Sequence, residues 1–208
     1  IAAKRARYER ALDLGAATAK GWAPIPEPSS FDVTHDDLDL YLDVGGPPLS
    51  GTATLDVAAA RDGVRALELD VDLGLRVLDV TLLADARHPA DSPRSLPFSH
   101  ADDRLAALLP SPLAAGDSVR LSISYGGRAS RFGNGVNWYS HRGFPEIFTF
   151  AEPFGARVWF PCNDRPDDKA TVELTVTAPS DLTVASNGLE LERGDNGDGT
   201  ATTTWSSQ

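Results

Sequence analysis

Apolar and polar side chains alternate along most of the chain from Phe31 onward, which is the pattern of half-buried β-strands. The clearest run has leucine or valine at every second position with polar residues between them: Leu38, Leu40, Leu42 and Val44. Similar runs lie at residues 53–59, 67–71, 75–83, 119–125 and 170–178, and a hairpin signal follows at 189–205. Between Val77 and Leu78 the parity of the apolar positions shifts, which predicts a β-bulge or a crossing point.

Short strands separated by turn residues predict an all-β fold, specifically a two-sheet β-sandwich or saddle-like domain over residues 31–208. Residues 1–30 are expected to form a short helix, over 4–20, and a proline-rich lead-in. The polar stretch 85–103 and the glycine-rich stretch 126–143 are interpreted as turns and loop. Residues 146–150 and 157–160 are predicted to be short strands.

Composition and charge narrow the classes of partner. The chain has 208 residues, of which 41% are hydrophobic and 24% charged, as in an ordinary soluble domain with a substantial core. Its net charge of −11 would repel a phosphate backbone, which argues against nucleic acid as a partner. No stretch approaches the roughly 18 apolar residues of a membrane span, so none is predicted.

The residue types that usually carry hydrolytic chemistry are scattered. No histidine lies in an H-E-x-x-H motif, and a zinc site needs three or four converging ligands, so we expect no metal or cofactor site in this chain. The single cysteine, Cys162, follows Phe160 and Pro161, and it is interpreted as an inert core residue. By itself the polypeptide is therefore expected to be inactive as a hydrolase.

One segment does not fit simple strand patterning. Residues 152–170 read EPFGARVWFPCNDRPDDKA. This run resembles the segment E-P-x-x-A-R-x-x-F-P-C-x-D-x-P-x-x-K-A of the aminopeptidase N-like (gluzincin) zinc metallopeptidases, and the resemblance extends over roughly residues 31–208. It implies the β-rich N-terminal domain of such an enzyme. It also implies that the zinc-binding catalytic domain lies in another part of the parent protein, and that the last strand of this domain could lie beyond residue 208.

The resemblance implies a substrate-binding role for Glu152. In similar enzymes the glutamate at this position accepts hydrogen bonds from the free α-amino group of the peptide, a charge-assisted contact that disfavours substrates without a free N-terminus. Pro153 belongs to the same segment. Phe150 stands where the family commonly has glutamine, so it is expected either to bias the site toward apolar first residues or to be a core residue.

The resemblance also implies structural support for this segment. Arg157 and Asp164 match the family pattern and are expected to form an ion pair, with Cys162 beside them in the core. Arg165 and Asp167 are interpreted as a solvated turn, because exposed ion pairs contribute little to stability.

The resemblance therefore implies one domain of a zinc-dependent aminopeptidase, a domain that caps the active site and whose partners are a peptide substrate and its own C-terminal catalytic domain. Zinc would belong to the full-length parent. Two alternatives stay open: a noncatalytic β-sandwich binding module, with Trp138 and Tyr139 as exposed aromatic residues, and a scaffold protein whose peptidase domain has decayed. The excess of arginine over lysine suggests a bacterial source, with either a cytoplasmic or a secreted or periplasmic location.

Overall fold

The computed structural model describes residues 29–45, 48–88, 93–131, 133–152 and 154–207. The described chain is almost entirely β-structure, with one 3-10 turn, η2 (Ala156–Val158). The strands are β1 (Phe31–Leu42), β2 (Leu49–Ala59), β3 (Val64–Asp70), β4 (Leu75–Asp85), β5 (Arg94–Ser95), β6 (Phe98–Ala101), β7 (Arg104–Leu113), β8 (Ser118–Gly127), β9 (Ser130–Arg131), β10 (Asn134–His141), β11 (Phe144–Phe150), β12 (Thr171–Pro179), β13 (Leu189–Asp195) and β14 (Thr200–Ser207).

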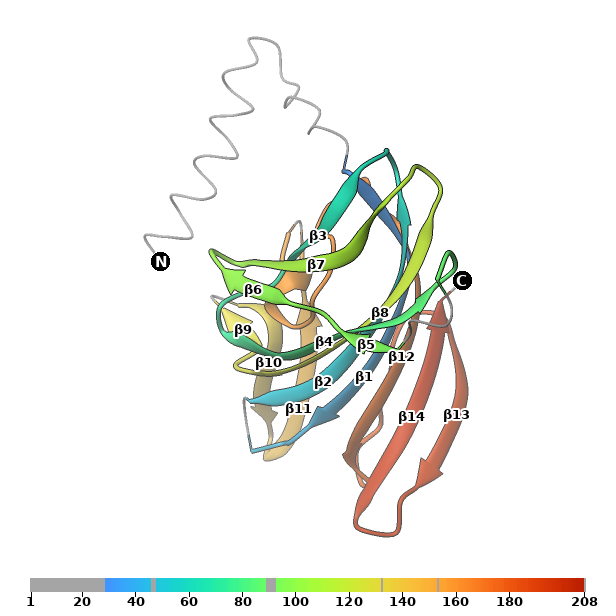
Figure 1. Ribbon diagram of the computed structural model, residues 1–208. Coiled ribbons are helices and arrows are strands. Elements are labelled where there is room, and N and C mark those ends of the chain that lie inside the picture. The colour runs from blue at the N-terminus through green and yellow to red at the C-terminus, as the bar shows by residue number, and fades with distance from the viewer. Residues whose placement is uncertain (1–28, 46–47, 89–92, 132, 153, 208) are drawn as a thin grey trace, which may run out of the picture.

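These strands form three sheets (Figure 1). The largest has the order β13-β14-β12-β1-β2-β8-β4-β5, in which β1 and β12 are parallel and the other pairs are antiparallel. The two small sheets have the orders β3-β7-β6 and β11-β10-β9. In Figure 1 the β13–β14 hairpin extends from one edge of the large sheet, away from β3, β6 and β7.

One apolar core joins the large sheet to the β3-β7-β6 sheet. Leu55 and Leu121 come from the large sheet, and Leu67 and Leu105 from the small one, and all four are fully buried. Because alternate residues of a strand point to opposite faces, each sheet contributes its apolar face and leaves its polar face outside. Trp138 and Ile147 of the third sheet pack against the edge of the same core.

The predicted all-β fold class is confirmed, and the described strands form three sheets where two were expected. The predicted bulge in β4 is also present, as a register shift between Val77 and Asp79 against β8. The expected N-terminal helix and most of the proline-rich lead-in lie outside the described residues. No helix in the described part of the chain is long and apolar enough to cross a membrane.

The interpretation of residues 126–143 as a loop is wrong. This stretch contains β9 and all of β10, which pairs with β11 from Gly135 opposite Phe150 to His141 opposite Phe144. The sequence pattern did not predict a strand here because glycine has a low strand propensity. Two of the glycines are nevertheless required by the geometry of the hairpin. Gly143 occupies its turn at φ +86°, and Gly135 marks a close approach of neighbouring backbone.

Two smaller predictions also fail. Residues 157–160 were expected to be a strand, but the chain forms η2 there, with amide hydrogen bonds from Val158 to Gly155 and from Trp159 to Ala156. The run 158–160 is apolar at three consecutive positions, which is too short a span to distinguish a strand from a helical turn. The polar stretch 85–103 contains the short strands β5 and β6, which are held by pairing rather than by apolar alternation.

Candidate functional site

Glu152 lies in the loop between β11 and η2, and its side chain is exposed to solvent. Phe150, the last residue of β11, is 46% exposed, and Phe154 on the other side of the glutamate is 48% exposed. The interpretation of Phe150 as a core residue is therefore wrong. Pro153 lies outside the described residues. The loop thus presents an acidic side chain between two accessible aromatic rings.

The β10–β11 hairpin leads directly into this loop and has two unlike faces. Its inner face carries Trp138 and Ile147, and the Trp138 indole N–H donates to the Asp43 carbonyl at 3.0 Å. Its outer face carries exposed aromatic residues, and the Tyr139 and Phe148 rings stack with centroids 5.3 Å apart. We call this outer face, which consists of Tyr139, Phe144, Phe148 and Phe150, the aromatic face.

Glycines allow the hairpin and η2 to pack closely. Gly135 in β10 has φ +84°, and a Cβ atom there would lie 2.3 Å from the Ala129 carbonyl oxygen and 2.6 Å from Val158 Cγ1. A Cβ at Gly155 would lie 3.1 Å from Ala151 Cα. Side chains at these two positions would push η2 away from β10 and would open the loop that carries Glu152.

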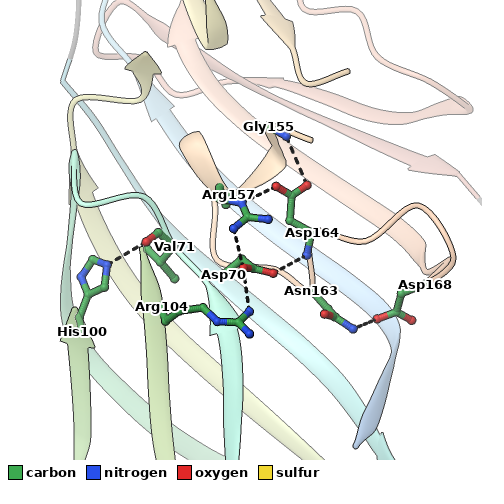
Figure 2. A network of polar contacts seen from close by, with 9 residues as sticks. All are labelled: Asp70, Val71, His100, Arg104, Gly155, Arg157, Asn163, Asp164 and Asp168. Atoms are coloured by element: carbon green, nitrogen blue, oxygen red, sulfur yellow. Dashed lines mark hydrogen bonds and ion pairs between the residues drawn. The ribbon is translucent and has the colours of Figure 1, made fainter. Parts of the chain in front are cut away.

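A network of charges centred on the buried carboxyls of Asp70 and Asp164 holds the segment that follows Glu152 (Figure 2). Arg157 Nε donates to Asp164 Oδ2 at 2.6 Å, so the ion pair expected from the sequence is present. Arg157 Nη1 also contacts Asp70 Oδ1 at 2.7 Å, and Arg104 Nη1 donates to the same oxygen at 2.8 Å. The network therefore joins the loop to β3 and β7, which lie far away in the sequence.

Backbone hydrogen bonds also join the segment 157–164 to the end of β3. The Asp70 N–H donates to the Cys162 carbonyl at 2.7 Å, and the Cys162 N–H donates to the Asp70 carbonyl at 3.2 Å. The Asp72 N–H donates to the Arg157 carbonyl at 2.9 Å. Residues 157–164 thus lie beside the edge of β3 and satisfy backbone groups that an edge strand would otherwise leave unpaired.

Burial and charge shift the titration of two members of this network. Burial disfavours the charged form of Arg157, but the hydrogen bond to Asp164 and the charge of Asp70 outweigh this effect and raise its pKa. Burial raises the pKa of the Cys162 thiol well above its ordinary value, and the charge of Asp164 adds to the effect. Cys162 is buried and stays protonated, which suits packing and not nucleophilic attack.

A second group of acids lies beside this network. Burial, together with the charge of Asp168, raises the pKa of Asp36 on β1 to about 7. Burial, together with a hydrogen bond that the protonated Asp168 carboxyl donates to Asp32, raises the pKa of Asp168 to about 6. Asn163 donates its side-chain amide to Asp168 (Figure 2). These acids are close to one another, so they favour shared protons over full ionisation.

The described residues do not supply a zinc site. Across the described ranges, no three His, Cys, Asp or Glu side chains stand close enough together to hold a metal ion. His35 shares a hydrogen bond with Thr171, and His100 contacts the Val71 carbonyl, so both contribute to strand and loop contacts.

Asp70 and Asp36 are the functional candidates that sequence reasoning missed. Asp70 has the parity of the polar face of β3, because Leu69 and Val71 on either side of it are buried. Asp70 is buried only because residues 157–164 pack against this edge of β3. Asp36 has the same parity as Leu38 and Leu40, so the alternation of β1 places its carboxyl on the core side, and the register shift between Val33 and His35 lets Phe31 and Val33 face the core as well. The burial of Asp70 leaves no local signal in the sequence, whereas the burial of Asp36 follows from that alternation.

Comparison with known proteins identifies the family. The Peptidase M1 N-terminal domain family matches residues 33–208, which is most of the chain. The chain belongs to this family. Membership of this family explains the all-β architecture and the motif at residues 152–170.

Curated relatives of this M1 N-terminal domain include two named aminopeptidases. It is 29% identical over 185 residues to aminopeptidase B of Rattus norvegicus, a match that covers 79% of the chain and 28% of that protein. It is 25% identical over 182 residues to leucine aminopeptidase 2 of Vanderwaltozyma polyspora, covering 83% of the chain and 26% of that protein. The chain thus spans under a third of the length of these relatives.

Solved structures show the same architecture. The M1 N-terminal domain superposes on an M1 zinc metallopeptidase from Deinococcus radiodurans with a TM-score of 0.73 and 29% identity, over 86% of this chain and 39% of that one. A mutant enzyme from that organism, in complex with a Tyr-Ser-Ala substrate, matches with a TM-score of 0.72 and 30% identity over the same shares. A related structure is described as a two-domain M1 zinc metallopeptidase bound to L-arginine.

Proposed function

We propose that this domain is one part of a zinc-dependent aminopeptidase that removes N-terminal residues from peptides. In this proposal the domain caps the active site, and Glu152 binds the free α-amino group of the substrate. The zinc ion and its ligands belong to a following catalytic domain. Membership of the M1 family supports the reaction class, and the names of the relatives support the preference for free N-termini.

The single observation that carries the proposal is the placement of Glu152. Its side chain is exposed at the end of the hairpin, while the next residues are fixed by buried ion pairs. Arg157, the cation within the same segment, is engaged by Asp70 and Asp164. An accessible carboxylate on a rigid support can receive an ammonium group once a neighbouring domain excludes water from the contact.

Substitution of Glu152 by Gln in the full-length parent protein tests this role. Gln keeps the shape and removes the charge, so kcat/KM for an aminoacyl p-nitroanilide should fall about 10- to 150-fold, the effect of losing a hydrogen bond to a charged group (about 1.5–3 kcal/mol). Glu146→Gln is the matched control, because Glu146 is an exposed acid on β11 of the same hairpin. If E152Q retains activity within twofold of the wild type, Glu152 does not bind the amine.

Phe150 suggests which first residue of the substrate the same site prefers. A flat apolar ring replaces the amide that is common in the family, and nearly half of its surface is accessible. We therefore propose that the enzyme favours apolar first residues, because an apolar side chain gains by leaving water against the ring. A panel of aminoacyl substrates in the same assay measures this preference.

One observation favours a second candidate, a binding module. The aromatic face carries the stacked pair Tyr139–Phe148, and exposed aromatic rings are common in binding surfaces. Of the two aromatic residues singled out in the sequence, Trp138 turns toward the core and only Tyr139 is exposed. A peptide or glycan array probed with the 208-residue chain separates this role from that of an aminopeptidase domain.

A further inference from the structure

We infer that Asp70 is a positioning residue that holds Glu152 at the rim of the proposed site. This inference rests on the proposed function, because it concerns the same carboxylate. Asp70 lies at the end of β3, 82 positions before Glu152, and the residue is only 3% exposed. It does not touch the proposed substrate contact itself and acts through the loop.

Both carboxylate oxygens of Asp70 are used by the loop (Figure 2). Oδ1 receives the Arg157 guanidinium at 2.7 Å, and Oδ2 accepts the backbone N–H of Asp164 at 3.1 Å. Arg104 of β7 donates to Oδ1 at 2.8 Å and fixes the carboxylate from the other side. Asp70 therefore joins both ends of the segment 157–164 to the rigid β3-β7-β6 sheet.

The chain of contacts then continues toward Glu152. Asp164, oriented by Arg157, accepts the backbone N–H of Gly155 at 3.3 Å through Oδ1. Gly155 lies three residues after Glu152 and packs against Ala151, the residue before it. Fixing Gly155 therefore fixes the loop on both sides of the glutamate.

The charge of Asp70, and not only its shape, is needed for this role. Arg157 and Arg104 are both cations that meet at one oxygen of Asp70. An amide in its place would leave the largely buried Arg157 facing Asp164 alone, and the half-exposed Arg104 would lose its anionic partner. Asp70→Asn should therefore loosen the loop even though it preserves the volume of the side chain.

The first test uses the 208-residue chain and does not depend on activity. In hydrogen–deuterium exchange, peptides that cover residues 151–165 should exchange at least about tenfold faster in D70N than in the wild type, because local opening becomes easier. Asp85→Asn is the matched control. It breaks another ion pair of a buried aspartate, Asp85 with Arg87 at 2.8 Å, at the far end of β4. D85N should leave exchange in 151–165 unchanged.

The second test is a double-mutant cycle in the full-length parent protein. D70N should lower kcat/KM about 10- to 100-fold, mainly through a higher KM, because a displaced Glu152 carboxylate binds the α-amino group of the substrate more weakly. In the E152Q background the same D70N change should cost less than twofold, because the group that it positions is gone. A residue with a merely structural role would impose the same loss in both backgrounds.

Each outcome decides the inference. Unchanged exchange in 151–165, or an undiminished D70N effect in the E152Q background, would overturn the positioning role. If D70N does not fold, Arg157→Lys carries the same tests, since it keeps the charge and loses the fork that bridges Asp70 and Asp164. If E152Q alone has no effect while D70N accelerates exchange, the proposed function fails and the anchoring of the loop stands.

Discussion

At the scale of single residues, Asp36 is a buried carboxyl on β1 with a raised pKa. It is 8% exposed, it points to the core side of β1, and its Oδ1 has no hydrogen-bond partner among the described residues. Burial and the charge of Asp168 raise its pKa to about 7, against an ordinary value of 3.8. The folded protein therefore binds this proton more tightly than the unfolded chain.

Asp36 should make stability fall as the pH rises. Its stabilising contribution is complete below about pH 4 and is lost as the pH rises through about 7, because the folded state must then bury a charge. Asp36→Asn imitates the protonated form and should gain stability relative to the wild type between pH 4 and pH 8, by at most about 4 kcal/mol at about 1.4 kcal/mol per pKa unit. Urea unfolding at several pH values measures the difference.

Asp37→Asn controls for net charge in this experiment, since it removes the same charge from the partly exposed neighbouring position on β1. A difference in the free energy of unfolding between D36N and the wild type that stays constant from pH 4 to pH 8 would contradict the assignment.

At the scale of elements, the close contact between β10 and η2 sets the position of η2, where the Glu152 loop ends. Local propensity argued against a strand in this glycine-rich stretch, yet β10 is held by pairing with β11 over seven positions. The glycine at position 135 is there because neighbouring atoms leave no room for a Cβ.

Gly135→Ala should destabilise the domain by about 2–4 kcal/mol, from the positive φ together with the clash against Ala129 and Val158. Gly143→Ala is the control in the same hairpin, because it has φ +86° with nothing within 4 Å of the added Cβ, and it should cost only about 1–2 kcal/mol. Thermal or urea unfolding of the two variants measures the difference. Equal losses would show that the close approach contributes nothing.

At the scale of the whole molecule, the domain presents a carboxylate and an aromatic face but only part of a binding site. A solvent-exposed ion pair contributes about 0–1 kcal/mol, whereas millimolar affinity needs about 4 kcal/mol. The 208-residue chain should therefore give no measurable heat with leucine amide in isothermal titration up to about 10 mM. The full-length parent should bind or hydrolyse it. Submillimolar binding by the domain alone would mean that the pocket is complete within it.

The sequence by itself determined the fold class, most strands of the two packed sheets, the bulge in β4 and the family, because alternation and a dense motif are local properties of the chain. Only the tertiary structure decided that Asp70 is buried and that β10 is a strand. The physical reason is that burial of a polar group depends on which distant segment covers it. Residues 157–164 return to the edge of β3, and this contact makes an ordinary aspartate the support of Glu152.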